Sequence, residues 1–178
     1  MCVEYPDKRA VVAAGAGATV LAPPLDVMTL GRMAVLMDPT GAAISLWQPK
    51  DMPGSELANE PGAFAWNELN TRDVPGSKEF YSTLFGWAAN DAGGDGMEYF
   101  EWKLGDKSVG GMMPMPAMVP AQVPNHWLTY FAVTDCDAST AKVKELGGNV
   151  MVEPMDIPAG RFSVCAGLLG EAFGLIRL

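Results

Sequence analysis

Few residues of this chain carry the chemistry of metal centres or of nucleophilic catalysis, and their spacing limits what they can do. His126 is the only histidine, so a site with two histidines and one carboxylate cannot form within one chain. No serine–aspartate or cysteine pattern accompanies this histidine, and a catalytic triad is therefore not indicated. We expect His126 to be either a hydrogen-bonded residue at a strand edge or a proton donor or acceptor at the rim of a site.

The sulfur-containing residues give weaker signals. Cys2, Cys136 and Cys165 form no C-x-x-C pair, so free thiols in a reducing cytoplasm are the simplest interpretation. Cys136 is flanked by Asp135 and Asp137, whose charges disfavour a thiolate. A methionine cluster could bind Cu(I), but without neighbouring Cys or His an adaptable apolar lining is favoured; its members are Met112, Met113, Met115 and Met118.

The charge balance excludes two classes of partner. The net charge is −9, from 12 basic and 21 acidic side chains, and the chain contains no run of Lys or Arg. Nucleic acids and anionic membranes attract clustered positive charge, so we expect neither as a partner.

Lys8 and Arg9 precede an uncharged stretch, residues 10–25, that resembles a signal peptide. The acidic residues before it and its internal glycines and prolines argue against that interpretation, and it is too short to span a bilayer.

The chain contains an internal repeat. Residues 17–46 align with residues 147–175, and glycine, proline, aspartate and arginine recur in the same order. The identical pairs are Gly17/Gly147, Val20/Val150, Pro24/Pro154, Asp26/Asp156, Gly31/Gly160, Arg32/Arg161, Val35/Val164, Gly41/Gly170, Ala43/Ala172 and Leu46/Leu175. Composition alone does not readily produce this order, so it indicates two copies of one structural unit.

Each copy is predicted to form three short strands, because apolar and β-branched runs alternate with turn residues. In the second copy these strands are expected at residues 149–154, 160–166 and 172–177. A helix at 138–146 precedes them, and an aromatic and β-branched strand at 126–134 precedes the helix. The second copy therefore belongs to a β-α-β-β-β module.

The middle of the chain repeats this order. A strand at 63–70 leads to a helix through residue 85, with Asp73 as its N-cap and Gly86 at its end. Strands are then expected at 87–90, 97–104 and 107–113. The chain start supplies a helix at 7–14 and the three strands of the first copy, without an opening strand. The predicted organisation is a partial module at 1–47, a linker at 48–61 and a complete domain at 62–178, made of modules 62–115 and 126–178.

This module order resembles the vicinal oxygen chelate superfamily, which includes glyoxalases, bleomycin-resistance proteins and dioxygenases. Residues 71–87 (TRDVPGSKEFYSTLFGW) are similar to its strand-to-helix signature, and residues 36–47 (LMDPTGAAISLW) to its terminal hairpin. Residues 109–113 are similar to the third strand of a module. The resemblance implies an α+β fold with repeated βαβββ modules, whose curled mixed sheets surround a cavity and carry helices on the outer face. Relative to two-domain members, the chain resembles an N-terminally incomplete protein.

The resemblance also implies where a metal would be held. The metal enzymes of the family place ligands in the first and last strands of their modules. The first-strand positions correspond to Trp66 and Leu128 here, and the last-strand positions to Ser45 and Gly174. None of these side chains is a metal ligand, so we expect no metal and no cofactor.

Strand alternation then predicts which side chains face the cavity. If Trp66 holds a former ligand position, the same parity turns further residues inward, namely Glu68, Asn70, His126, Tyr130, Ser45 and Trp47. Trp66, Trp102 and Tyr130 could stack on flat or cationic rings, or belong to the core. Glu68 between aromatic walls suits a cationic ligand or a general base; the alternative is a structural carboxylate bonded to Arg72 or to backbone donors.

Together these features favour a metal-independent, cytoplasmic protein that binds a small apolar, aromatic or cationic molecule. A metal-dependent lyase or dioxygenase of the same superfamily is one alternative, and a truncated, non-catalytic interaction module is another. The partial module would expose strand edges and an apolar face, so a homodimer is expected.

Overall fold

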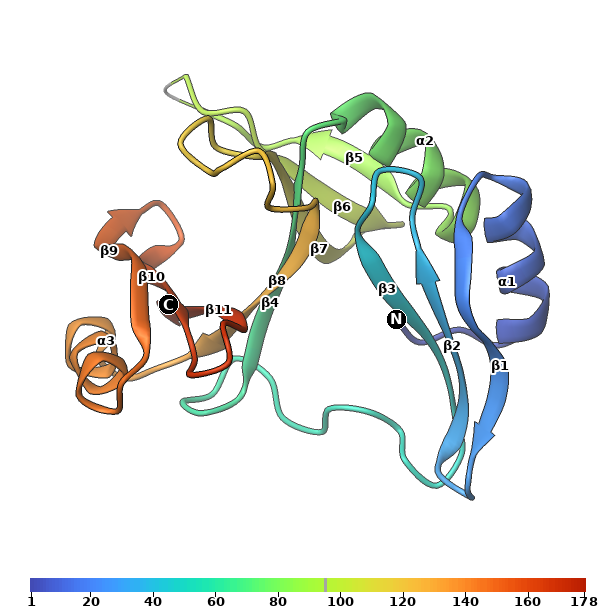
Figure 1. The fold of residues 1–178 in the computed structure, drawn as a ribbon, viewed down its shortest axis with the longest axis horizontal. Coiled ribbons are helices and arrows are strands. Elements are labelled where there is room, and N and C mark those ends of the chain that lie inside the picture. Colours follow the sequence, from blue (N-terminus) through green and yellow to red (C-terminus); the bar gives the residue numbers. More distant parts are fainter. Residues whose placement is uncertain (95) are drawn as a thin grey trace. The chain divides into compact units, whose positions relative to one another are not determined.

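The computed structural model describes residues 1–94 and 96–178. These residues form two compact units, each described by itself below (Figure 1). Unit 1 comprises residues 1–54 and 69–127, and unit 2 comprises residues 55–68 and 128–178. In the part of the chain that the structure describes, every helix is too short or too polar to cross a membrane.

Unit 1 begins with α1 (Pro6–Gly15) and an antiparallel sheet of β1 (Thr19–Val27), β2 (Gly31–Met37) and β3 (Ala43–Pro49). One face of this sheet is covered by α1, since Ala10 and Ala13 are buried in the same cluster as Leu36 and Leu46. Residues 1–3 extend the sheet: Cys2 forms a parallel bridge with Trp47 of β3, and the Val3 N–H donates to the Trp47 carbonyl over 2.8 Å.

The rest of unit 1 contains the end of β4 (Phe64–Thr71), α2 (Val74–Phe85), β5 (Ala88–Asp91), β6 (Phe100–Leu104) and β7 (Lys107–Pro114), with strand order β5-β6-β7-β4. Asp73 caps α2 as predicted, because its Oδ1 accepts from the Gly76 N–H over 2.9 Å. Gly86 ends the helix with φ at 72°, a left-handed conformation that glycine adopts without strain.

An aromatic cluster around Tyr81 forms the core of unit 1. The Tyr81 ring centroid lies 5.1 Å from that of Phe80, 5.8 Å from Trp87, 5.6 Å from Trp102 and 5.4 Å from Trp127. Most of these pairs have the edge or offset geometry that aromatic rings prefer. Large aromatic surfaces thus hold α2 against the sheet.

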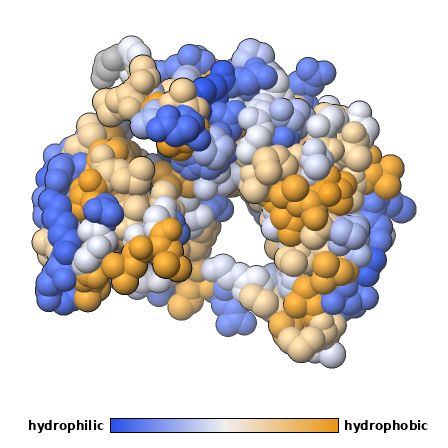
Figure 2. Space-filling view, in the orientation of Figure 1, coloured by the Kyte–Doolittle hydropathy of each residue, from blue (hydrophilic) through white to orange (hydrophobic). Residues whose placement is uncertain are grey.

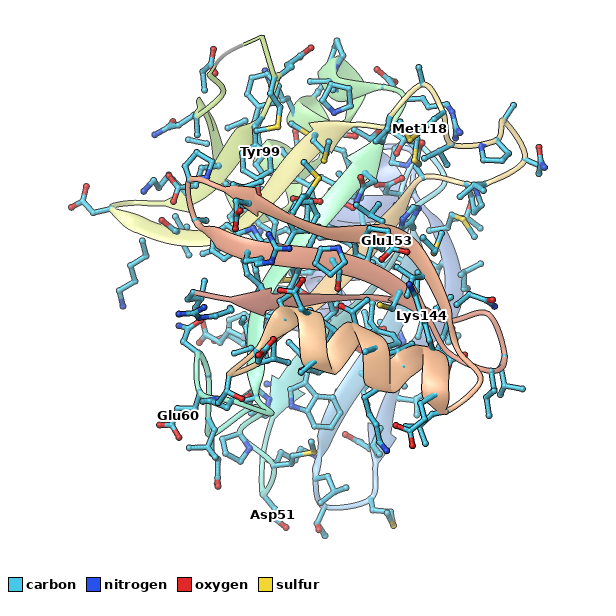
Figure 3. All side chains as sticks on the ribbon, turned by 90° about the vertical axis from the view of Figure 1, so that its left-hand side faces the viewer. Asp51, Glu60, Tyr99, Met118, Lys144 and Glu153 are labelled. Atoms are coloured by element: carbon cyan, nitrogen blue, oxygen red, sulfur yellow. The ribbon has the colours of Figure 1, made fainter. Side chains whose placement is uncertain are left out.

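Unit 2 contains the start of β4, most of β8 (His126–Ala132), α3 (Cys136–Glu145), β9 (Asn149–Ile157), β10 (Gly160–Ala166) and β11 (Ala172–Arg177). The strand order is β8-β11-β10-β9, with β11 parallel to β8 and the other pairs antiparallel. Helix α3 covers one face over Cys165 and Leu175, and Lys144 near its end pairs with Glu153 of β9 at 2.8 Å (Figure 3). The α+β fold class predicted from the sequence is confirmed.

The sequence repeat is also a structural repeat. In β1–β2, Val27 pairs with Gly31 and Asp26 with Arg32, and in β9–β10 Ile157 pairs with Gly160 and Asp156 with Arg161. Likewise Val35 pairs with Ser45, and Val164 with Gly174. Every aligned pair named here occupies the same register, so the two copies share one backbone pattern.

Candidate functional site

Three of the predicted site residues come together in unit 2. Glu68 and Trp66 lie on β4, and Tyr130 lies on β8. The Tyr130 hydroxyl donates to Glu68 Oε1 over 3.1 Å, and both residues are only 7% exposed. A buried carboxylate is unfavourable unless it is hydrogen-bonded, and this hydroxyl supplies one such bond.

The side chains around this pair are apolar. Tyr130 belongs to a buried cluster that covers the sheet face away from α3, together with Leu128 and Ile176. Trp66 and Phe162 pack against the cluster, and the Phe162 and Tyr130 ring centroids lie 6.2 Å apart. The site therefore combines the Glu68 carboxyl group with aromatic and aliphatic side chains, a composition suited to a flat or cationic molecule.

Gly174 of β11 makes room for the tyrosine. A Cβ atom at this position would overlap the Tyr130 ring, so the ring lies directly against the β11 backbone. Glycine is thus required at residue 174 by close approach rather than by an unusual φ angle. As a result, Tyr130 fills the space that a side chain at this last-strand position would occupy.

The remaining predicted site residues lie in unit 1. Trp102 is fully buried against Tyr81 and Trp87, so of the two expected alternatives, stacking on a ligand or a place in the core, the structure shows the core. Its indole N–H has no hydrogen-bond partner among the described residues. The alternation along β6 turns this residue toward α2, and only the position of the helix could have revealed that.

Four further predicted residues of unit 1 occupy separate places. Ser45 is exposed, while Trp47 is half-buried over Gly31 and donates its indole N–H to the Met52 carbonyl over 3.1 Å. Asn70 is buried near the end of β4. His126 is half-buried, with Nδ1 2.9 Å from the Pro124 carbonyl oxygen, which fits the expected hydrogen-bonded histidine at a strand edge.

Sequence reasoning missed a buried polar network in unit 1. The Asp38 carboxylate accepts hydrogen bonds from Thr40, from the Ala42 N–H and from the Tyr81 hydroxyl, all within 2.9 Å. Burial, together with the Asp38 charge, holds the pKa of Tyr81 well above its ordinary value. Asn125 extends the network by donating to the Thr40 carbonyl over 2.8 Å. The Asp-Pro-Thr-Gly hairpin in the sequence was a signal for this anchor, although the tyrosine partner was not evident.

The residues present do not fit a metal centre of the family type. Among residues 1–94 and 96–178, no group of three or more His, Cys, Asp or Glu side chains is placed to hold a metal ion. At Gly174, the position to which the family resemblance assigns a last-strand ligand, the Tyr130 ring takes the space of a side chain.

Comparison with known proteins agrees with the fold and the motifs. Residues 63–167 match the Glyoxalase/Bleomycin resistance protein/Dioxygenase superfamily, and the chain belongs to this superfamily. It is 42% identical over 165 residues to "Putative glyoxylase CFP32" of Mycobacterium tuberculosis, covering 90% of this chain and 61% of the relative. It is 39% identical over 163 residues to "Anthracycline biosynthesis protein DnrV" of Streptomyces peucetius, covering 92% and 58%. The chain thus spans about three fifths of the length of these relatives.

Solved structures show the same fold at low sequence identity. The Mn(II)-bound glyoxalase from Novosphingobium aromaticivorans matches with a TM-score of 0.65 and 16% identity, over 99% of this chain and 60% of that protein. The 2,3-dioxygenase LapB from Pseudomonas sp. KL28 matches with a TM-score of 0.62 and 14% identity, over 97% and 67%. At these identities the likeness concerns the fold alone.

Proposed function

We propose that this protein is a metal-independent, cytoplasmic, small-molecule-binding member of its superfamily, and that Glu68 anchors an aromatic or cationic ligand. The observation that carries this proposal is the buried Glu68–Tyr130 pair on an aromatic sheet face, at 3.1 Å. The replacement of a last-strand ligand position by Gly174 under the Tyr130 ring supports metal independence. The relatives named for anthracycline biosynthesis favour a polycyclic aromatic ligand.

Isothermal titration calorimetry with daunorubicin tests this proposal. Daunorubicin is an aromatic quinone that carries an ammonium group. We expect E68Q to weaken binding by about tenfold, because a partly desolvated ion pair contributes on the order of 1.4 kcal/mol. E153Q is the matched control, since Glu153 also lies in unit 2 but pairs with Lys144 at the surface. Y130F should weaken binding less than E68Q, because it removes a hydrogen bond and leaves the charge.

The same titration separates the alternatives. Binding that is unchanged after chelation and after addition of Mn²⁺ or Zn²⁺ supports the proposal. Binding that requires the metal would instead favour a metal-dependent lyase or dioxygenase of the superfamily. The absence of heat with daunorubicin and with a panel of other quinones and aromatic cations would favour a non-catalytic interaction module.

We further propose that the functional form is a homodimer. Helix α1 covers one face of the β1–β3 sheet, and apolar side chains gather at the surface over these strands (Figure 2). Leu21 and Leu25 of β1 are exposed. Exposed apolar patches of this kind commonly mark protein interfaces. Sedimentation equilibrium at micromolar concentration tests the proposal; a monomer with an intact β1–β3 sheet would contradict it.

A further inference from the structure

A second candidate site lies in unit 1, apart from the Glu68–Tyr130 pair of unit 2. It is a groove of about 700 Å³ between the start of α2 and the connection from β7 to β8. A volume in this range is typical of sites for small organic molecules. The residues that line it are Thr71, Arg72, Val74, Pro75, Glu98, Pro114, Met115, Pro116, Ala117, Met118, Val119, Pro120 and Ala121.

The outer wall of the groove is held in place by hydrogen bonds. Arg72 donates from Nη1 to the Val123 carbonyl over 2.5 Å, and from Nη2 to the Pro120 and Val119 carbonyls over 3.0 and 3.4 Å. At the base of the wall, the Met115 N–H donates to the Thr71 carbonyl over 2.8 Å. Because these bonds lie within the protein itself, a ligand would meet a wall that is already ordered.

Most of the lining residues have apolar side chains, and two of them are clustered methionines, although backbone and side-chain polar atoms also reach the groove surface. Met115 is buried at the base, whereas Met118 is 87% exposed and extends from the β7–β8 connection (Figure 3). Of the other two, Met112 is fully buried in the core and neither it nor Met113 lines the groove. Unbranched, polarizable methionine side chains adapt to ligands of irregular shape, which suits Met118 to cover an apolar molecule.

The groove lining contains one basic and one acidic side chain, Arg72 and Glu98, and the two differ in how their hydrogen-bonding groups are used. Arg72 lies in the groove lining, but its guanidinium is engaged by three backbone carbonyls of the wall. Glu98 is exposed, and the described residues give it neither an ion pair nor a hydrogen bond. The chain also carries a net charge of −9, which attracts cations in general. Arg72 keeps its positive charge, but its donors are directed to the wall, whereas the Glu98 carboxylate at the rim is open to an ammonium group.

We propose that this groove binds an apolar molecule that carries one ammonium group, with Glu98 beside the cation and Met115 and Met118 against the apolar part. The site is independent of the proposed function, because every lining residue belongs to unit 1 and Glu68 belongs to unit 2. The two proposals can therefore fail separately.

The test is a titration of protein labelled with ¹³C in its methionine methyl groups, followed by NMR. The probes are 4-phenylbutylamine, 4-phenylbutanol and 4-phenylbutyrate, which differ only in their polar end. We expect the amine to shift the Met115 and Met118 signals with a Kd about threefold to fivefold lower than that of the alcohol, as a rim ion pair supplies. The carboxylate should bind more weakly than the alcohol, and Met28, an exposed methionine outside the groove, should not respond.

Three variants make the result specific. E98Q should remove the preference for the amine over the alcohol, whereas E79Q, which makes the same charge change on α2 outside the groove, should retain it. E68Q should also retain it, which distinguishes this groove from the site of the proposed function. Equal Kd values for the three probes, an unchanged preference in E98Q, or no shift of either methionine would overturn the proposal.

Discussion

The two copies of the internal repeat share one backbone pattern but use it differently. In the first copy Arg32 bonds Asp7 through Nε and Nη2, each at 2.8 Å, and also contacts Asp26 and the Pro24 carbonyl. In the second copy Arg161 makes the same set of contacts, with Asp137, Asp156 and the Pro154 carbonyl. An arginine on the second strand therefore ties the preceding helix to the first hairpin in both copies.

The hairpin tips differ. The tip of the first copy, residues 38–42, is anchored by the buried Asp38 carboxylate to the Tyr81 hydroxyl at 2.8 Å. The tip of the second copy, residues 167–171, has glycine at the aligned position and leaves Leu168 and Leu169 exposed at 76% and 96%. The two copies thus keep the same strand register and arginine contacts, while the residues at the hairpin tip determine whether the tip is anchored or exposed.

Ser45 and Gly174 occupy equivalent positions in the two copies, and exchanging them tests the difference between the copies most directly. We expect G174S to lower the free energy of unfolding by about 1–3 kcal/mol, because its side chain must displace the buried Tyr130 ring. The reciprocal S45G change, at an exposed strand position, should cost about 0.5–1 kcal/mol. Urea denaturation of the two variants measures both values. Equal losses of unfolding free energy in the two variants would mean that the Tyr130 ring moves aside at no cost and that its close approach to Gly174 does not contribute to stability.

The anchored tip predicts the next largest difference. D38N keeps the shape of the side chain but removes the charge to which Thr40, Ala42 and Tyr81 donate hydrogen bonds. We therefore expect the free energy of unfolding to fall by about 1–3 kcal/mol. E171Q changes the same charge in the open tip, where Glu171 accepts from the Leu169 N–H, and should stay within about 0.5 kcal/mol. Chemical denaturation at neutral pH checks both; similar losses in both variants would remove the distinction between the tips.

The anchor should also be visible in the pH dependence of stability. Burial and the Asp38 charge raise the pKa of Tyr81 in the folded state, so its contribution is fully present below the unfolded pKa, about 10. Stability is therefore expected to fall as the pH rises from about 10 through the folded-state pKa. Denaturation of the wild-type protein and Y81F at pH 8 and pH 11 measures this. A fall of equal size in Y81F would assign the effect to other groups.

The arginine contacts predict the smallest effect on stability, and one that is the same in both copies. The hydrogen bonds from Arg32 and Arg161 lower the pKa of Asp7 and Asp137, respectively. R32Q should raise the pKa of Asp7 toward its ordinary value without changing that of Asp137, and R161Q should do the reverse. NMR titration of the two carboxyl groups measures these shifts. Each contribution to stability is present above the unfolded pKa and is lost as the pH falls through the folded one.

Much of the fold was predictable because local signals and the repeat pointed the same way. The strands at 160–166 and 172–177 were predicted with the observed bounds, since turn residues delimit them on both sides. The strand predicted at 97–104 begins at Phe100 instead, because residue 97 joins only an isolated bridge with Gly94. Strand boundaries that depend on pairing with another strand, and not on turn residues, were thus harder to predict from the sequence.

The candidate site was only partly predictable. Alternation along β4 predicts that Leu69 faces the helices, and Leu69 lies in the core of unit 1; that Glu68 faces a cavity stays a prediction. The Glu68–Tyr130 hydrogen bond depends on how two strands meet, and the burial of Trp102 depends on the position of α2. Such contacts join residues far apart in the chain, so periodicity alone does not reveal them.

The distribution of tryptophan has a spectroscopic consequence. Of the 5 tryptophans, Trp47, Trp87, Trp102 and Trp127 belong to unit 1, and Trp66 alone belongs to unit 2. Three of the four in unit 1 surround Tyr81, where close rings exchange excitation energy. The intrinsic emission of this protein therefore reports chiefly on unit 1. Replacing Trp66 with phenylalanine would leave an emission signal for unit 1 only, and the difference from the wild-type spectrum would isolate the environment beside the Glu68–Tyr130 pair.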